Sequence, residues 1–331
     1  MDKKTDPNIN FISNVLEQYS VGKLLGKPIL LKGDTLDVNY KITNSLGNSY
    51  FLKCVSENRD VRFWNFLGDL HYRLRFSGVP VPNIYKNNSG GYVTNYCLLF
   101  EFMPGKAKKN WTNQETGSAA LNLAKMHRQL EKIDTPSFIR NQTDNYIRCE
   151  DINFNSQYVF PKILSSTIDN DIKKEISATI TELDTGLSGY KFSKHIIHGD
   201  FGEGNALFNK GKLTAIIDLT LRYDSLIYDL GVNIFWTCVI REKNKRINLE
   251  RYKQIITSYQ HCRRLSQRER RMLPYFILRR SCATFFYSWQ KNASEDPISM
   301  NVVNQQMKEI AIWNKGIRDN VSIMSEIIET P

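Results

Sequence analysis

Two apolar, strand-like runs that each end at an acidic residue constrain this chain most. The run His195-Ile196-Ile197 leads into His198-Gly199-Asp200, and Asn205 follows five residues after the aspartate. The run Ala215-Ile216-Ile217 ends at Asp218. A glycine-bearing turn lies between the runs, so we predict two converging strands that carry an aspartate, an asparagine and a second aspartate at their ends.

Phosphoryl transfer from a nucleotide uses these residue types. One carboxylate orients the acceptor hydroxyl and takes its proton, while an asparagine and a second carboxylate hold the magnesium that bridges the phosphates. Mg²⁺ takes hard oxygen ligands, few of them from protein. The alternative for any single Asp or Asn is a local role, because both residues favour turns. The combined pattern favours a kinase active site with ATP and Mg²⁺ as cofactors.

The segment from His198 to Asn205, followed by Ile217-Asp218, resembles the motif of the aminoglycoside phosphotransferase and choline kinase superfamily. The resemblance implies an α+β, two-lobed protein-kinase-like fold, with a small antiparallel β-sheet lobe carrying one helix and a larger, mainly helical lobe. It also implies that Asp200 is the catalytic base and that Asn205 and Asp218 bind the metal. Leu219 stands where this superfamily usually has an aromatic residue, a difference that concerns packing.

The chain has 331 residues, 41% of them hydrophobic, which is enough to build two lobes. The break at Pro104-Gly105 predicts a nucleotide-binding lobe over 1–104 and a catalytic and substrate-binding lobe over 105–331. We expect no signal peptide and no membrane span. Six scattered cysteines without a Cys-x-x-Cys pair are expected to be mostly buried free thiols, typical of a cytoplasmic protein.

The net charge of +11 comes largely from residues 241–280, which hold thirteen Lys and Arg against three Glu. Solvated helix faces are the favoured explanation. The second is a positive field that attracts an anionic partner or a carboxylate-bearing substrate. Nucleic acid ranks last, because no recognised binding motif accompanies the charge.

The first hundred residues predict two β-hairpins and supply the expected nucleotide-binding residues. By the resemblance, a loop arches over the phosphates and the strand Ser49–Val55 provides a lysine, Lys53, which is otherwise out of place in an apolar run. The acid expected to pair with this lysine lies on the helix predicted for 60–76, and the backbone near the lobe boundary is expected to bind adenine. The expected nucleotide-binding residues are Lys53, Gly33, Asn39, Asp69, Glu101 and Met103. Gly33 could equally serve only to make a turn.

Helical spacing continues through most of the rest of the chain. Thr112 and Glu115 predict a capping box, and His127 on the following helix is expected to be structural. Asp229 is expected both to start a helix and, by the resemblance, to brace the catalytic loop. Pro274 and Pro297 are expected to break the C-terminal helices.

Within the superfamily, the chain is most similar to type II homoserine kinases, for example at Tyr19-Ser20-Val21-Gly22 and Tyr228-Asp229. The acceptor is therefore expected to be a small-molecule alcohol, preferably a homoserine-like amino acid, with Arg222 and Asp224 as candidate substrate ligands. The positive charge also favours such a substrate over a polycationic drug. An antibiotic or choline-type phosphotransferase and a nucleotide-binding regulatory protein stay open as alternatives, as does the oligomeric state.

Overall fold

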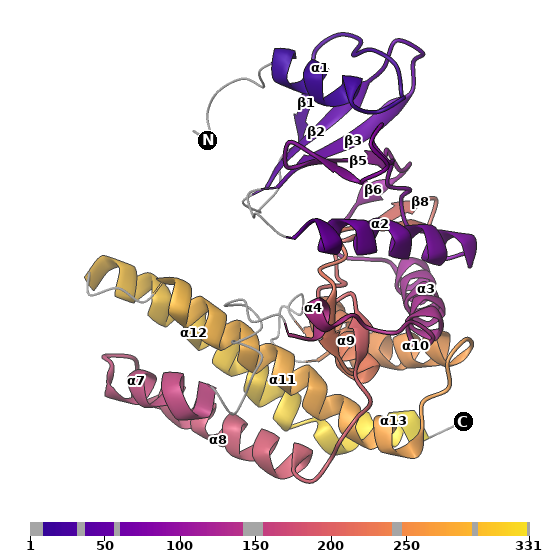
Figure 1. The fold of residues 1–331 in the computed structure, drawn as a ribbon. Coiled ribbons are helices and arrows are strands. Elements are labelled where there is room, and N and C mark those ends of the chain that lie inside the picture. The colour runs from indigo at the N-terminus through magenta and orange to yellow at the C-terminus, as the bar shows by residue number, and fades with distance from the viewer. Residues whose placement is uncertain are drawn as a thin grey trace. The chain divides into compact units, whose positions relative to one another are not determined.

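The computed structural model describes residues 9–31, 37–55, 60–141, 155–239, 247–292 and 297–329, which form two compact units (Figure 1). The first unit comprises Met1–Lys106 together with Leu207–Asn209 and Thr214–Ile217, and the remainder forms the second. Both short pieces lie beyond Pro104-Gly105, in the part of the sequence predicted to belong to the second lobe. The predicted mixed fold, with an antiparallel sheet and many helices, is confirmed.

A five-stranded sheet of order β1-β2-β3-β5-β4 forms the centre of the first unit, and its strands pair antiparallel. The strands are β1 (Ile29–Leu31), β2 (Val38–Thr43), β3 (Ser49–Cys54), β4 (Val93–Thr94) and β5 (Cys97–Glu101). The register places Asn39 directly opposite Lys53. Two residues named as nucleotide ligands are therefore cross-strand neighbours.

Helix α1 (Ile9–Glu17) packs its apolar face on this sheet. Its buried residues Ile12, Val15 and Leu16 recur at helical spacing and join a core with Leu52 and Leu99 of the sheet. Burial of this face removes a large apolar area from water, which stabilises the unit.

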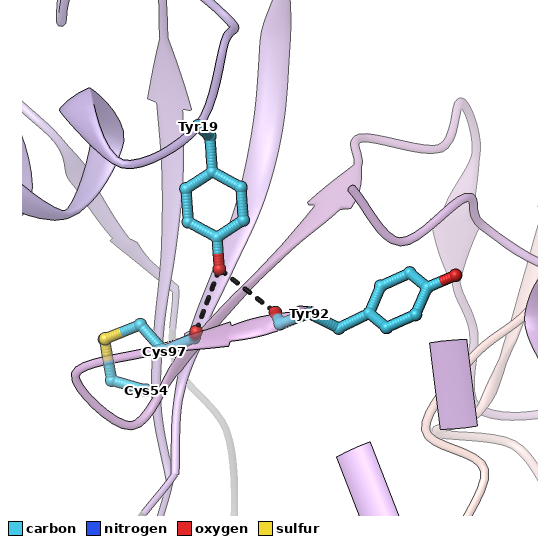
Figure 2. The surroundings of a disulfide bond; sticks show 4 residues. All are labelled: Tyr19, Cys54, Tyr92 and Cys97. Carbon is cyan, nitrogen blue, oxygen red and sulfur yellow. Dashed lines mark hydrogen bonds between the residues drawn. A yellow bond between two sulfur atoms is a disulfide. The ribbon is translucent and has the colours of Figure 1, made fainter. Parts of the chain in front are cut away.

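Tyr19, which follows α1, hydrogen-bonds to the β4–β5 hairpin (Figure 2). Its hydroxyl lies 3.1 Å from both the Tyr92 and the Cys97 carbonyl oxygens, and it donates to them. Burial raises the pKa of Tyr19 to about 12, so the hydroxyl keeps the proton that it donates. A fold role therefore accounts for the tyrosine of the Tyr19-Ser20-Val21-Gly22 motif.

Cys54 and Cys97 are joined in a disulfide between facing residues of β3 and β5 (Figure 2). The expectation of free thiols is wrong for this pair. The sequence hid the pair because the two residues are 43 positions apart and become neighbours only when the strands align. Cys238 and Cys282 are buried free thiols, as expected.

Helix α2 (Val61–Phe76) lies within the range predicted for it, and its N-cap is Asp60, whose side chain accepts a hydrogen bond from the Arg62 backbone N–H. Gly68 on this helix is packed against a tyrosine: an added Cβ would lie 2.5 Å from the Tyr92 ring. Because Gly68 has no side chain, α2 can pack closely against Tyr92, which directly precedes β4.

Two small sheets have the orders β10-β7 and β6-β8-β9. Their strands are β6 (Lys106–Ala107), β7 (His195–Ile197), β8 (Ala206–Asn209), β9 (Lys212–Ile216) and β10 (Arg222–Asp224). The β10-β7 sheet belongs to the second unit, whereas β6, β8 and β9 each have residues in both units. The second unit is otherwise mainly helical. Its helices are α3 (Asn113–Leu130), α4 (Ser137–Arg140), the π-helical η1 (Asn155–Val159), α7 (Phe160–Ser165), α8 (Asn170–Leu187), α9 (Leu226–Ile234), the π-helical η2 (Phe235–Val239), α10 (Leu249–Gln260), α11 (Gln267–Asn292), α12 (Pro297–Arg318) and α13 (Val321–Glu329).

Helix α11 lies against α12 and α8 in the second unit (Figure 1). Pro274 lies inside α11, so the predicted break there is wrong, whereas Pro297 does begin a new helix. Proline removes one backbone bond, to the carbonyl of Arg270. The buried neighbours Leu273 and Phe276 keep the segment packed despite that loss. Among the described residues, no helix is long and apolar enough to cross a membrane.

Candidate active site

The short ribbon of β7 and β10 presents the loop that contains Asp200. The strands pair antiparallel with Arg222 opposite Ile197. Beyond the paired residues, the backbone N–H of Thr220 donates to the carbonyl of His198 at 3.2 Å, and the Thr220 hydroxyl donates to the same oxygen. Asp200 follows His198 by two residues, and Asp218 precedes Thr220 by two. The hydrogen bonds between Thr220 and His198 therefore help to position both acids.

Gly199 makes the turn that aims Asp200. Its φ of +82° is in the left-handed region, and an added Cβ would lie 2.6 Å from Arg222 Cδ and 2.7 Å from Thr220 Oγ1. Backbone conformation and space both exclude a side chain here. The His-Gly-Asp spacing therefore has a structural cause.

Asp229 braces this loop from the first turn of α9, as the resemblance implied. Its carboxylate is fully buried and accepts the backbone N–H groups of His198 at 2.9 Å and Gly199 at 2.8 Å. Burial by itself would raise the pKa of Asp229, but the hydrogen bonds and the neighbouring His127 hold it below its usual value. The loop is therefore held by an ionised carboxylate.

His127 and Tyr259 extend this hydrogen-bond chain into α3 and α10. His127 Nε2 lies 3.0 Å from Asp229 Oδ2, and Nδ1 lies 2.7 Å from the Tyr259 hydroxyl. Burial lowers the pKa of His127 although Asp229 acts against it, and burial raises the pKa of Tyr259. A protonated Tyr259 thus donates to a neutral His127, which donates to Asp229. His127 is therefore structural, as predicted. It supports, through Asp229, the loop that contains Asp200.

Asp200 lies among three donors. Its Oδ1 accepts from Trp236 Nε1 at 3.1 Å and from Arg280 Nη2 at 3.0 Å. Asn205 Nδ2 donates to the Asp200 carbonyl at 2.8 Å and lies 3.4 Å from Oδ2. Two donors occupy Oδ1, which makes Oδ2 the oxygen suited to accept a proton from an acceptor. The structure therefore brings Asp200 and Asn205 together, as predicted.

Arg280 and Trp236 are site residues that the sequence analysis missed. Arg280 is 2% exposed, its guanidinium lies 5.4 Å from the centre of the Trp236 ring, and both side chains reach Asp200. Gly202 permits this arrangement, because a Cβ there would lie 2.6 Å from the indole. The sequence does contain a sign of such a residue: the charged pair Arg279-Arg280 follows the apolar run from Phe276 to Leu278.

Asn205 and Asp218 fit a magnesium ion by donor chemistry. Because Asn205 Nδ2 bonds to Asp200, the amide oxygen is the atom available to a metal. Asp218 has φ +61°, an unusual conformation for a non-glycine residue and one that is frequent at functional sites. Among the described residues, no group of three or more His, Cys, Asp or Glu could hold a metal. Two protein ligands completed by phosphates and water are what Mg²⁺ requires.

Lys53 lies on β3 in the first unit and pairs with Asp37. Its Nζ is 3.2 Å from Asp37 Oδ2, and both side chains are about one-fifth exposed, at 18% and 20%. The side-chain oxygen of the facing Asn39 is buried without a hydrogen-bond partner among the described residues. A buried acceptor without a partner is costly, so a donor from a bound ligand or water would stabilise it.

The predicted pairing of Lys53 with Asp69 is wrong for the described residues. Asp69 lies exposed on α2, and its Oδ1 accepts from the Tyr92 hydroxyl at 2.9 Å. Asp37 directly precedes β2, whose residue Asn39 faces Lys53, whereas Asp69 lies on α2. Gly33, the phosphate-loop candidate, falls outside the described residues.

Glu101 ends β5, and Met103 lies two residues further along the chain. The Glu101 N–H donates to the Asn83 carbonyl at 2.9 Å, and its carboxylate pairs with Arg75 at 2.6 Å. The N–H and the carboxylate of Glu101 are thus engaged within the first unit, and the adenine contact expected of this segment's backbone stays a prediction. Met103 follows the end of β5, and its backbone N–H makes no bond to another backbone group in the described chain. Met103 is the better candidate to bind an adenine ring.

The two candidate substrate ligands lie on β10. Arg222 is 8% exposed, and its side chain packs over Gly199, where an added Cβ would lie 2.6 Å from Arg222 Cδ. Asp224 pairs with Arg279 at 2.7 Å, and although burial acts to raise its pKa, the Arg279 charge holds that pKa below its usual value. Arg222 therefore borders the catalytic loop, whereas Asp224 is engaged in a structural ion pair.

The chain is similar over most of its length to a curated protein with a stated activity. It is a homoserine kinase from Chelativorans sp. (strain BNC1), 25% identical over 295 residues, which cover 86% of this chain and 87% of that one.

Solved structures share the fold at low sequence identity. A microcompartment-associated aminopropanol kinase is 16% identical with a TM-score of 0.73, covering 96% of this chain and 99% of that one. The amicoumacin kinase hAmiN, in complex with AMP-PNP, Ca²⁺ and Ami, is 15% identical with a TM-score of 0.68, covering 92% and 93%. Choline kinase from Cryptosporidium parvum Iowa II is 12% identical with a TM-score of 0.61, covering 96% and 97%.

The family model described as "Phosphotransferase enzyme family" matches residues 30–258. That range covers well over half of the chain and includes Asp200, Asn205 and Asp218. This chain belongs to the phosphotransferase enzyme family.

Proposed function

We propose that this phosphotransferase is an ATP- and Mg²⁺-dependent kinase that phosphorylates the hydroxyl of a small molecule, preferably a homoserine-like amino acid. The observation that carries the proposal is the placement of Asn205 against Asp200, on a loop that Asp229 braces. It provides a proton acceptor beside a side-chain oxygen that can bind a metal.

In the proposed reaction, the acceptor hydroxyl donates a hydrogen bond to Asp200 Oδ2 and attacks the terminal phosphorus of the nucleotide. A bond forms between the hydroxyl oxygen and phosphorus, the bond to the leaving ADP oxygen breaks, and the proton passes to Asp200. Asn205 and Asp218 would hold Mg²⁺, which when bound neutralises phosphate charge. Trp236 and Arg280 keep the base oriented through Oδ1.

The nucleotide would be bound by residues of the first unit. Lys53 is the cation for the phosphates, and a phosphate would compete with Asp37 for it. Asn39 faces Lys53 and is the candidate from the phosphate loop, together with Gly33. Met103 would bind adenine through its backbone.

Homoserine is the preferred acceptor because a curated protein that is similar to this chain over most of its length is a homoserine kinase. The basic segment 241–280, of which 241–246 lie outside the described residues, supports an acceptor with a carboxylate. Arg222 borders the catalytic loop and is retained as a candidate ligand, with Asp224 as the weaker one. An antibiotic or an amino alcohol is the second candidate, since solved structures of this fold include kinases of both.

The test is an ATP-consumption screen with Mg²⁺ over homoserine, other hydroxy amino acids, choline, aminopropanol and several aminoglycosides, with identification of the phosphorylated product. Phosphohomoserine at millimolar substrate or below supports the full proposal. A phosphorylated drug or amino alcohol alone would replace the acceptor and keep the reaction. Tight Mg·ATP binding without turnover of any acceptor would favour a regulatory nucleotide-binding protein instead.

A cytoplasmic location is part of the proposal, and the Cys54–Cys97 disulfide counts against it, because disulfides rarely persist in reducing cytosol. Thiol titration of denatured protein purified from cells with the thiols trapped should find both cysteines reduced if the protein resides there. Their recovery as a disulfide would contradict that location.

A further inference from the structure

The loop between α8 and β7 carries two aromatic side chains that hold an arginine of α11. The rings of Tyr190 and Phe192 are stacked, with their centres 6.5 Å apart and their planes at 19°. The guanidinium of Arg268 lies 5.1 Å from the centre of the Tyr190 ring and 4.9 Å from that of Phe192. Phe192 also meets the buried Phe276 of α11 edge-on, with ring centres 5.2 Å apart. The loop and the start of α11 therefore form one ordered piece of surface.

Arg268 is an exposed cation without a recorded carboxylate partner. Its contacts in the described parts of the chain are the two rings. By contrast, Arg263, Arg279 and Arg318 of the same unit each pair with an acid. Glu269, which follows Arg268 in sequence, is held by Arg263 at 2.7 Å. The N–H donors of the Arg268 guanidinium are therefore available to water or to a bound molecule.

Two lysines add to the positive charge of this loop. Lys191 stands between the two aromatic residues in sequence and Lys194 follows them, and both side chains are exposed. Residues 188–194 include no acid. We refer to the following residues as the aromatic-basic surface: Tyr190, Lys191, Phe192, Lys194 and Arg268.

Neighbouring acids leave this positive charge largely unbalanced. Lys194 lies within electrostatic reach of Asp224, but that carboxylate is already paired with Arg279 at 2.7 Å. Glu182 and Asp184 precede the loop on α8, and in the described structure neither makes a recorded ion pair with the aromatic-basic surface. The surface thus combines three cations with two aromatic rings.

This combination fits an acidic peptide segment. Arginine and tyrosine are enriched among the residues that dominate protein–protein binding energy, and a guanidinium can hold a carboxylate by two parallel hydrogen bonds. Because Phe192 is already fixed against Phe276, binding would order little further chain. Single-stranded nucleic acid suits the surface less well. Its bases stack on open aromatic faces, whereas Arg268 lies against both rings here.

We infer that the aromatic-basic surface is a docking site for an acidic segment of a partner protein, with Arg268 binding a carboxylate and Tyr190 packing beside it. This inference goes beyond the proposed function and does not rest on it, because none of these residues belongs to the proposed active site.

The experiment measures binding of a fluorescein-labelled peptide of alternating glutamate and glycine to the full-length protein by fluorescence anisotropy, at low and at physiological salt. Two labelled probes of the same length serve as comparisons: the peptide with glutamine in place of glutamate, and an oligothymidylate. The variants are Arg268→Gln, Arg268→Lys, Tyr190→Ala and Lys191→Gln. The matched control is Arg73→Gln, which removes an exposed arginine from α2 in the first unit. Thermal unfolding checks that each variant is folded.

We expect the glutamate peptide to bind, more weakly as salt is added, and the glutamine peptide not to bind. Arg268→Gln should raise the Kd about 10-fold or more, as for loss of hydrogen bonds to a charged group. Arg268→Lys, which keeps the charge but not the planar fork, should fall between Arg268→Gln and the wild-type protein. Tyr190→Ala and Lys191→Gln should each raise the Kd about 2- to 5-fold. Arg73→Gln should leave the Kd within about 2-fold, as expected for a charge outside the surface.

Three results would overturn the inference. The first is no binding of the glutamate peptide at low salt. The second is an equal rise in Kd for Arg268→Gln and Arg73→Gln, which would assign binding to the net charge of the protein. The third is tighter binding of the oligothymidylate than of the glutamate peptide, which would make the partner a nucleic acid. Should Arg268→Gln fail to fold, Lys191→Gln decides, because it leaves the aromatic contacts of Arg268 in place: a Kd above that of Arg73→Gln supports the inference, and an equal Kd overturns it.

Discussion

Replacement of Asp229 by Asn tests how the catalytic loop is held. The carboxylate accepts from the backbone N–H groups of His198 and Gly199 and from the His127 ring, all within 3.0 Å. An Asn of the same shape has one oxygen, so its NH₂ must face one of these donors. If the asparagine oxygen takes the place of Oδ2, the NH₂ group takes the place of Oδ1, and the Gly199 N–H that donates to Oδ1 loses its acceptor.

The cost follows from these contacts. An unsatisfied buried donor costs about 1–3 kcal/mol, and the two remaining bonds each lose about 1 kcal/mol when the acceptor is no longer charged. We therefore expect Asp229→Asn to lower the free energy of unfolding by about 3–5 kcal/mol, within the typical total of 5–15 kcal/mol. The misplaced loop should also reduce kcat by about 10²-fold.

Urea unfolding and the rate of phosphate transfer measure both effects, and hydrogen exchange at the Gly199 amide reports the lost bond directly. Asp171→Asn is the control, because that side chain is 90% exposed on α8 and should leave stability and rate unchanged. In a double-mutant cycle with His127→Gln, the two changes should be non-additive by about 0.5–3 kcal/mol. A loss of stability below about 1 kcal/mol with unchanged kcat and unchanged protection of Gly199 would refute the bracing role.

Two further predictions concern pH and the metal. Burial holds the pKa of His127 below the usual histidine value of about 6.5, so below that pH the unfolded chain binds a proton that the folded protein does not. Stability should therefore be full above that pH and fall as the pH drops below it, by up to about 1.4 kcal/mol per pH unit, before the lowered pKa of Asp229 contributes at more acidic pH. His127→Gln should flatten this slope in urea unfolding, and an unchanged slope would assign the effect to another group. Asp218→Ala should abolish the Mg²⁺-dependent gain in AMP-PNP affinity measured by calorimetry; the same gain in variant and wild type would exclude Asp218 as a ligand.

Local patterns in the sequence predicted much of the fold. Capping by Thr112 with Glu115 and the apolar face of α2 depend on residues within one or two turns, and the structure contains both. The His198-Gly199-Asp200 motif is likewise local, because its glycine is required by backbone conformation. Such features do not depend on how distant segments pack.

Features that depend on distant segments could not be read in the same way. The Cys54–Cys97 pair needs the register of β3 on β5, and the partner of Lys53 depends on how the strands align. Arg280 reaches Asp200 across 80 residues, from a helix that continues through Pro274 where a break was expected. A buried arginine in an apolar stretch indicates that a partner exists, but only the packed structure identifies it.

The most direct test of the central claim is the rate of phosphate transfer by Asp200→Asn, on the acceptor that the wild-type protein phosphorylates fastest. Mg·ATP affinity is measured in parallel. The account predicts a kcat lower by about 10²-fold or more with nearly unchanged Mg·ATP affinity, as for loss of a positioned base. Undiminished kcat in Asp200→Asn would contradict the assignment of Asp200 as the base.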